Sequence, residues 1–385
     1  MSLLPELRSA SFHRQWEFQA RHNLSASAAE TLPLAELLDM AGPAEREAWD
    51  KLGLGYLETR GTALLRAAAA SLYRKLEAED LVMFSGGKEA IFATFHALLD
   101  KDDHVLLVAP NYQPLEEIPL AIASASAVSL RPEEGWRLSL DDVRAALRPR
   151  TRLICINFPH NPTGAVLDPE TFDGLVSLAA ERGIHILSDE VYRGLEHDPA
   201  AARPAIADVY ERGLSLNVLS KAWGLAGLRI GWIATRDEQA RSRIEAYQAY
   251  LSDGNAGPSD ILARIALLSS QRIIARNLGI VEENRRLLSA FFARHADRFE
   301  WQAPGAGCIA FPRYLGPGTV EDFCDVLLRQ AGVALMPSSI YQSRLAATPR
   351  DRFRIGFGKR SFTSGLEAME AALPATAQPG RRDPR

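Results

Sequence analysis

The chain has 385 residues, of which 47% are hydrophobic and 24% charged, values typical of a globular protein with one large domain and a smaller one. Its formal net charge of −4 gives no electrostatic reason to expect nucleic-acid binding. Because there is no membrane-length apolar stretch, no basic segment followed by an apolar run at the amino terminus, and no CxxC or Cys/His cluster, we expect a cytoplasmic protein without membrane association or a metal site.

The amino-terminal segment predicts one short helix and a loop. Residues 9–22 carry aromatic side chains among charged ones, which indicates an amphipathic helix that packs on the body of the protein or on a partner subunit. Residues 23–27 are short and rich in small side chains. From these residues alone, a plain turn is the simplest interpretation.

A glycine pair lies between a predicted strand and a predicted helix. After an Ala- and Leu-rich helical stretch at 62–76, the apolar run 81–84 leads into Gly86, Gly87 and Lys88, and a helical pattern follows to Leu99. Free N–H groups in the first turn of a helix attract anions, and glycine lets a phosphate approach closely. The alternative is an ordinary turn, because the spacing is not that of a nucleotide-binding P-loop.

Two further buried strands are each followed by a residue suited to ligand binding. The strand 104–109 precedes Tyr112, and the strand 152–157 precedes Asn161 in the run Asn-Pro-Thr-Gly. A turn explains the proline and glycine of that run but not the whole of it. We leave His160 open between a loop residue and a substrate-selecting one.

A carboxylate ends the next predicted strand. A helical stretch at 169–182 leads to the strand 184–189, which ends in Asp189, and Tyr192 follows. Ligands gather at the carboxyl ends of strands in open α/β sheets. A buried carboxylate there is costly unless it is paired with a cation or a hydrogen-bond donor.

One lysine lies in an apolar, glycine-rich run between two predicted strands. Lys221 follows the strand 213–218, and Arg229 comes eight residues later, near the start of the strand 228–234. Burial disfavours an ammonium and lowers its pKa, which makes the free amine available to attack a carbonyl and form a Schiff base. The alternative is a lysine whose charged end reaches solvent from a loop.

The carboxyl-terminal third predicts a second, smaller α+β unit. Its most informative element is the alternating run 351–358, which is typical of an edge strand and contains Arg352 and Arg354. A guanidinium offers two parallel hydrogen bonds to a carboxylate. The other predicted elements are a helix at 237–251, a long helix at 260–295, strands at 305–311 and 333–337, and a disordered tail at 374–385.

These motifs, in this order, resemble those of class I/II aminotransferases, the pyridoxal 5′-phosphate (PLP) enzymes of fold type I. The resemblance implies that Lys221 forms the aldimine with PLP and that Arg229 binds its phosphate. Asp189 would pair with the pyridine nitrogen, while Tyr192 and Asn161 would bind the phenolic oxygen. By the same resemblance Lys221, Asp189 and Tyr192 are the catalytic residues.

The resemblance also assigns the remaining binding residues. Gly86, Gly87 and Lys88 form the phosphate cup, Tyr112 stacks on the pyridine ring, and Tyr56 reaches the cofactor phosphate of the neighbouring subunit. Arg354 binds the substrate α-carboxylate together with Asn161, and the loop residues Ser25 and Ser27 are candidate substrate contacts. The family usually has Ser or Thr at the position of Val218, so either Ser220 replaces that phosphate contact or the contact is lost.

The implied fold is α/β. A large PLP-binding domain at 46–255 contains a mainly parallel mixed sheet flanked by helices, and residues 1–45 and 256–373 form a smaller α+β domain with a long connecting helix. The implied assembly is a homodimer with shared active sites. The implied reaction moves an amino group between an L-amino acid and a 2-oxo acid through pyridoxamine phosphate.

Two other functions remain open. The stretches 157–162 and 310–313 also resemble those of capreomycidine synthase, a PLP-dependent cyclase that acts on a hydroxylated arginine, so a cyclase or lyase reaction is the first alternative. The intact Asp-Glu-Val-Tyr run, residues 189–192, favours transamination. The second alternative is a non-catalytic regulator that retains the fold.

Overall fold

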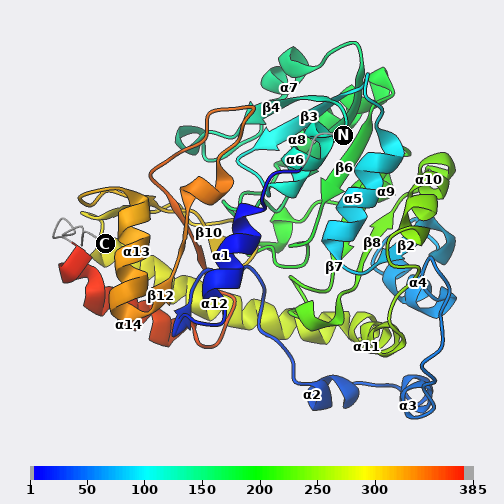
Figure 1. Ribbon diagram of the computed structural model, residues 1–385, viewed down its shortest axis with the longest axis horizontal. Helices are drawn as coiled ribbons and strands as arrows, with labels where there is room; N and C mark the ends of the chain where they lie inside the picture. Colours follow the sequence, from blue (N-terminus) through cyan, green and yellow to red (C-terminus); the bar gives the residue numbers. More distant parts are fainter. Residues whose placement is uncertain (1–3, 377–385) are drawn as a thin grey trace.

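A computed structural model of the protein describes residues 4 to 376, with side chains described as far as residue 373. Its centre is a seven-stranded sheet with the order β2-β8-β7-β6-β5-β3-β4 (Figure 1). Only β8 runs against its neighbours, so the sheet is mixed but mainly parallel. In sheet order the strands are Leu81–Phe84, Gly231–Ala234, Gly213–Val218, His185–Asp189, Thr151–Asn157, His104–Ala109 and Ser124–Ser129.

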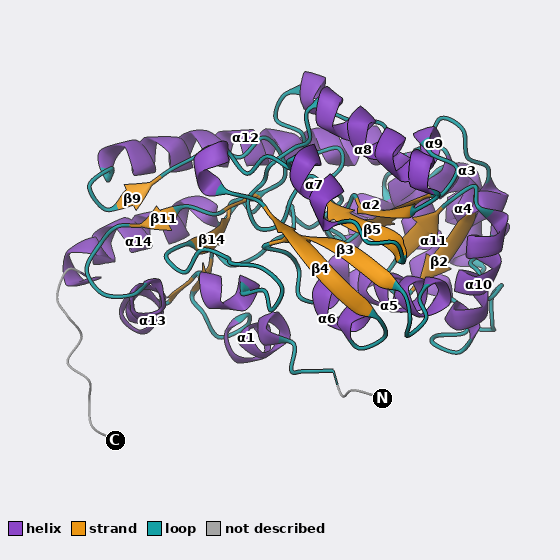
Figure 2. Cartoon of the chain, turned by 90° about the horizontal axis from the view of Figure 1, so that it is seen from above, coloured by secondary structure: helices purple, strands orange, loops and turns teal. Residues whose placement is uncertain are grey.

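Helices cover both faces of this sheet (Figure 2). Alternate side chains of β3 show why: Leu106 and Val108 pack with α7 and α8, whereas Val105 and Leu107 pack with α5, α6 and α10. Burial on both faces explains the apolar runs at 81–84 and 105–109. The covering helices are α5 Gly87–Leu98, α6 Pro114–Leu120, α7 Leu140–Ala146, α8 Pro169–Arg182, α9 Ile206–Val209 and α10 Glu238–Ala249.

A smaller α+β region contains the last third of the chain together with the amino-terminal segment. Its three-stranded sheet has the order β10-β14-β13, while β1 pairs with β12 and β9 with β11. The strands are β1 His22–Asn23, β9 Phe299–Glu300, β10 Ile309–Ala310, β11 Arg313–Tyr314, β12 Val333–Ala334, β13 Met336–Pro337 and β14 Phe353–Gly356. The helices are α1 Arg8–Trp16, α13 Val320–Ala331 and α14 Phe362–Thr376.

The predicted long helix at 260–295 is two helices, α11 Gly257–Leu268 and α12 Ser270–Arg294. The break lies at Ser269 and Ser270. The hydroxyl of Ser270 bonds back to the carbonyl of Leu267 (2.7 Å) and accepts a hydrogen bond from the indole of Trp223 (3.0 Å), so a side chain replaces part of the backbone ladder. The 25-residue α12 still runs from the large to the small region, as Figure 1 shows.

The predicted edge strand is wrong in one respect: β14 is the central strand of its sheet, paired with β10 and β13. Its alternating charges suggested solvent on one face, but Arg352 and Arg354 are both only 3% exposed. Arg352 lies over the ring of Trp136 and pairs with Glu300, so its charge is satisfied without an exposed edge. The pattern therefore identified the strand but not its position in the sheet.

Three short helices lie outside the sheet layers: α2 Leu34–Leu38, α3 Pro43–Asp50 and α4 Ala63–Ala70. All three pack against α11. The predicted helix at 62–76 is thus shorter than expected. Helix α14 continues to residue 376, past the expected start of the disordered tail at 374, and the rest of that tail lies outside the described residues. The division of the chain into domains at 46–255 stays a prediction.

Between residues 4 and 376, no helix is both long enough and apolar enough to cross a membrane.

Candidate active site

Lys221 lies just after β7, beside the loop that contains Ser27. Its Nζ donates to Ser27 Oγ at 2.8 Å, and the carbonyl of Ser27 accepts from Tyr192 Oη at 2.9 Å. Burial and, to a smaller extent, the charge of Arg354 together lower the pKa of Lys221 to about 8, while Asp189 acts in the opposite direction. About a tenth of this amine is therefore neutral at pH 7, and it is the neutral form that attacks a carbonyl.

Asp189 ends β6 and is 5% exposed. Burial raises its pKa to about 7, although the N–H of Val191, 3.3 Å from Oδ1, and the charge of Lys221 both favour the ionised form. Its backbone carbonyl accepts from Asn157 Nδ2 at 2.8 Å, which fixes the strand end. A desolvated carboxyl group without a strong cationic partner is suited to a ligand that brings its own protonated nitrogen.

Arg354 lies on β14 and faces the same region. Its Nη1 donates to Asn161 Oδ1 at 3.2 Å, and Nη2 donates to the carbonyl of Ser25 at 2.6 Å. Tyr341, whose ring lies 5.7 Å from the guanidinium carbon, also donates to Asn161 Oδ1 at 3.3 Å. Since Arg354 is almost wholly buried and its Nε has no partner among the described residues, it is held ready for an anion.

Ser25 and Ser27 place their hydroxyl groups differently, and their contacts with a substrate stay predictions. Ser25 is fully buried, and its Oγ donates to Asn23 Oδ1 at 2.8 Å. The small polar loop uses this hydroxyl to stabilise its own turn. Only Ser27 presents its hydroxyl to Lys221.

The opposite side of the site is cationic. Gly86, the residue before α5, has φ of 97°, and a Cβ there would lie 2.2 Å from Nη2 of Arg229. Lys88, in the first turn of α5, has a pKa lowered by desolvation and by Arg229. A helix start, a guanidinium and a lysine around a glycine form a cradle that fits a phosphate, and a side chain on Gly86 would fill it.

Val218 and Ser220 account for the departure from the family pattern at the predicted phosphate site. Val218 packs beneath the start of α5, where a Cβ on Gly87 would lie 2.7 Å from its Cγ1. The hydroxyl of Ser220 lies 3.5 Å from Nη1 of Arg229. The hydroxyl next to the arginine therefore comes from Ser220, and Val218 has a packing role.

Replacing Gly86 with alanine is expected to weaken cofactor binding at least about tenfold. The new Cβ would strain a backbone conformation that only glycine adopts readily, at a cost of about 1–3 kcal/mol, and would collide with Arg229. Gly227→Ala is the matched control, because a Cβ there would meet nothing within 4 Å. Titration of each cofactor-free protein with PLP measures the difference, and equal affinities would reject the cradle.

Three other residues singled out by sequence have clear positions. Tyr112 follows β3. Its pKa is raised by burial and by the charge of Asp189, which indicates that Tyr112 and Asp189 lie at the same end of the sheet. His160 is buried with a pKa of about 4 from desolvation; Nδ1 bonds Thr163 at 2.8 Å and Nε2 bonds the Pro110 carbonyl at 2.8 Å, so it supports a loop. Tyr56 is 96% exposed.

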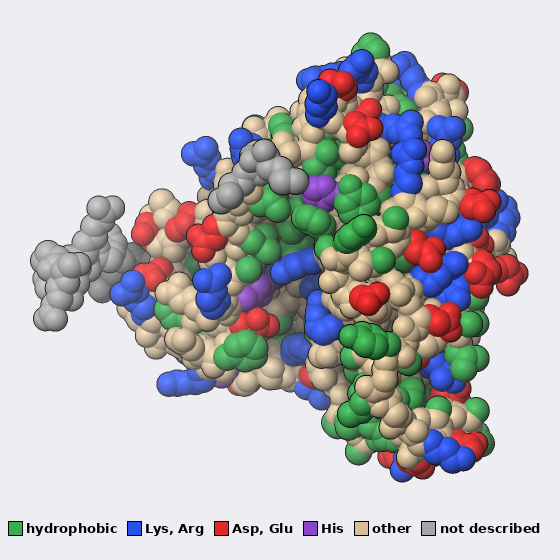
Figure 3. All heavy atoms as spheres, turned by 45° about the vertical axis from the view of Figure 1, so that its right-hand side comes forward, with side chains coloured by type: hydrophobic (Ala, Val, Ile, Leu, Met, Phe, Trp, Pro, Cys, Tyr) green, Lys and Arg blue, Asp and Glu red, His purple; other side chains and the backbone are tan. Residues whose placement is uncertain are grey.

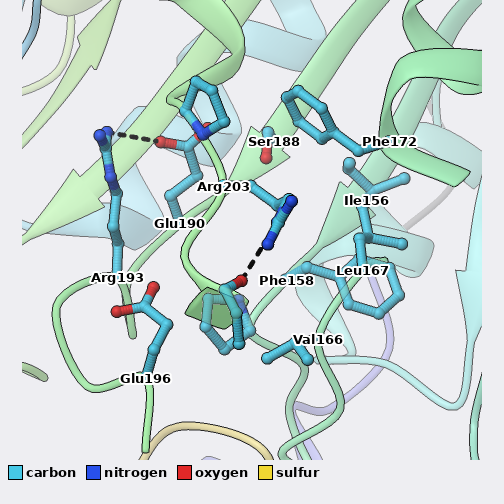
Figure 4. A pocket seen from close by; sticks show the side chains of 13 residues that line it. Ile156, Phe158, Val166, Leu167, Phe172, Ser188, Glu190, Arg193, Glu196 and Arg203 are labelled. Carbon is cyan, nitrogen blue, oxygen red and sulfur yellow. Dashed lines mark hydrogen bonds and ion pairs between the residues drawn. The ribbon is translucent and has the colours of Figure 1, made fainter. Parts of the chain in front are cut away.

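A small cavity behind β6 is distinct from this site (Figure 4). Its volume is about 30 Å³, enough for one or two waters but not for an amino acid. Glu190 lines it, 3.6 Å from Nη1 of Arg193, and its other oxygen accepts from the Ile206 N–H at 2.9 Å. Glu190 therefore anchors the chain behind the sheet.

Sequence reasoning missed three residues of the site. Asn157 fixes the Asp189 carbonyl and accepts the Asn161 N–H at 2.8 Å, while Tyr341 and His13 approach from η5 (Ser338–Tyr341) and α1. Asn157 was detectable as a polar side chain at the end of a mainly apolar strand. The other two lie in segments with no periodic pattern that points to a ligand. Figure 3 shows Lys and Arg side chains gathered around a hollow between the two halves of the molecule.

The chain is similar in sequence and in fold to known proteins. The family model for aminotransferase class I and II matches residues 23–362. The chain is 33% identical to capreomycidine synthase of Streptomyces vinaceus, over 98% of this chain and 96% of that protein. It is 35% identical to arginine–pyruvate transaminase of Pseudomonas aeruginosa over 51% of this chain and 52% of that protein. A PLP-dependent aminotransferase from Streptococcus suis superposes with a TM-score of 0.90 at 28% identity, over 98% and 100% of the two chains.

Proposed function

Because the chain belongs to the class I and II aminotransferase family and has the fold of a PLP-dependent aminotransferase, we propose that it moves an amino group between an L-amino acid and a 2-oxo acid. The observation that carries this proposal is the amine of Lys221, which has a pKa of about 8 and bonds Ser27 within the electrostatic influence of Asp189 and Arg354. One group is thereby available both to hold a cofactor aldehyde and to transfer a proton.

The site residues have separate roles in the proposed reaction. When bound, PLP supplies an electron sink for the negative charge that develops at the substrate Cα. Arg354 binds the substrate α-carboxylate through two parallel N–H groups and fixes the Cα position. The Nζ of Lys221 would remove the proton from the substrate Cα as a general base and, as a general acid, deliver it to the cofactor side rather than back to Cα.

Asp189 and the cationic cradle are the groups that we propose to hold the cofactor. The Asp189 carboxylate would accept a hydrogen bond from the protonated ring nitrogen, and Tyr192 and Asn161 would bind the ring oxygen. Gly86, Arg229, Lys88 and Ser220 are the residues that we propose to hold the phosphate. The sequence assigned each of these roles by resemblance, and the contacts around Lys221, Arg354 and Arg229 support that assignment.

We further propose that two copies of the chain complete one another's sites. Tyr56 and Leu54 are 96% and 86% exposed, and Leu268 at the end of α11 is 61% exposed, which leaves large apolar side chains on an outer surface. Isolated chains rarely expose several such side chains together unless they form an interface. This exposure supports a homodimer in which Tyr56 reaches the partner's cradle.

Cyclisation is the second candidate, because the similarity to capreomycidine synthase covers nearly the whole chain. A half-reaction distinguishes the two functions. If transamination is correct, the holoenzyme given an amino acid but no oxo acid will form one equivalent of 2-oxo acid and one of pyridoxamine phosphate per site, and then stop. Continued turnover of the amino acid into a cyclic product, with no pyridoxamine phosphate formed, would favour the cyclase instead.

A further inference from the structure

Helix α1 lies across the junction between the large and small regions, in front of the sheet end in Figure 1 and between α13 and α6 in Figure 2. Arg8 ties it to both sides. The backbone N and Nε of Arg8 donate to Gln113 Oε1 at 2.9 and 3.3 Å, while Nη1 and Nη2 donate to the carbonyls of Ser339 and Gln342 at 3.1 and 2.7 Å. Gln113 follows Tyr112, so both attachment points adjoin site residues.

His13 is brought to the site by this attachment. The preceding residue, Phe12, packs against the apolar cluster that contains Tyr341. Burial and, to a smaller extent, the charges of Arg354, Lys221 and Lys88 together lower the pKa of His13 to about 4. The ring is therefore neutral near pH 7, and it lies close enough to feel the three cations of the site.

The polar atoms of His13 are not satisfied by the protein. Nδ1 is buried without a hydrogen-bond partner, and Oε2 of Glu17, one helical turn later, lies 3.7 Å away. Among the described residues no hydrogen bond reaches Nε2 either. A hydrogen on Nδ1, the nitrogen that lies 3.7 Å from the Glu17 carboxylate, would leave a lone pair on Nε2.

We propose that His13, supported by Glu17, is a substrate-binding residue that accepts a hydrogen bond from the distal end of the substrate side chain. The inference rests on the proposed function, because it assumes that Arg354 holds the α-carboxylate of an amino acid. It deepens that function by naming a substrate class: amino acids with side chains that end in a hydrogen-bond donor, such as a guanidinium or an amine.

The charges around the imidazole are consistent with such a substrate. On α1, Glu17 provides a carboxylate, and Arg14 is exposed to solvent. The cations facing His13 from the other elements each have a partner in the complete site: the substrate carboxylate for Arg354, the cofactor for Lys221 and the phosphate for Lys88. The carboxylate beside His13 then favours a donor or a cation.

Binding of paired amino acids to the holoenzyme tests this inference. Dissociation constants are measured by spectral titration of the bound cofactor with L-arginine, L-norleucine and L-glutamate, for wild type, His13→Phe and His13→Gln. We expect His13→Phe to raise the Kd for L-arginine at least about tenfold and to change that for L-norleucine less than about twofold. His13→Gln retains an acceptor and should restore most of the preference, and Arg14→Gln is the control on the same helix.

The outcomes separate the two proposals. A wild-type protein that takes up no PLP would reject the proposed function itself. A coloured holoenzyme in which His13→Phe weakens L-arginine and L-norleucine equally, or weakens L-glutamate most, would overturn the role of His13 and leave the proposed function standing. Thermal unfolding of each variant shows whether α1 remains attached.

Discussion

Replacing Lys221 with alanine is expected to lower kcat for amino transfer at least about 10⁴-fold and to replace the absorbance of the lysine–cofactor Schiff base by that of the free aldehyde. Lys221 is the lysine that bonds Ser27 and whose pKa is affected by both Asp189 and Arg354. Added PLP should still bind through its phosphate and ring contacts. Activity with saturating amino acid, together with the absorbance spectrum, measures the effect.

Lys101 is exposed, so Lys101→Ala is the matched control and should behave like wild type. The pH dependence of cofactor loading adds a second measurement. Because only the neutral amine attacks an aldehyde, loading of the cofactor-free protein should accelerate as pH rises and level off above about pH 8, the pKa of Lys221. A rate that keeps rising toward pH 10, as for an ordinary lysine, would argue against burial as the source of its reactivity.

Replacing Asp189 with asparagine is expected to lower kcat about 10³-fold while the protein stays folded. The amide has nearly the same shape, but it cannot hold the ring nitrogen protonated, so the electron sink is lost. Absorbance should still report bound cofactor. Full activity in this variant would contradict the role of the carboxylate.

Stability provides an independent test of Asp189. Its pKa is raised from 3.8 to about 7 in the folded, cofactor-free protein, so the folded state binds more protons than the unfolded state between these values. The contribution of this residue to stability is therefore largest below about pH 4 and is lost as pH rises to about 7. The Tm of Asp189→Asn should lack this contribution, so the difference in Tm between the two cofactor-free proteins should change between about pH 4 and pH 7. A difference in Tm that is constant over this range would contradict the raised pKa.

The residues at strand ends were predictable from sequence because strands and site residues are adjacent in the chain. Asp189 ends a buried strand, Asn161 and Lys221 each follow one, and the carboxyl ends of parallel strands share one edge of the sheet. Arg354 was found for a different reason: its type and spacing match the family, although its strand is central and not at an edge.

The remaining contacts depend on tertiary structure that local pattern does not encode. Ser25 and Ser27 look alike in sequence, yet one stabilises its own loop and the other bonds Lys221. His13 reaches the site only because Arg8 attaches α1 to segments more than a hundred residues away. The role of Tyr56 depends on a second chain, so its exposure in one chain is compatible with the prediction without testing it.

The central claim is that the buried amine of Lys221 carries the cofactor, and reductive labelling tests it most directly. Holoenzyme is treated with borohydride, which locks the cofactor onto the amine that holds it, then digested and mapped by mass spectrometry. The account predicts one pyridoxyl group per chain, on Lys221. A label on Lys88 or Lys359, or a protein that takes up PLP without any reducible bond, would contradict it.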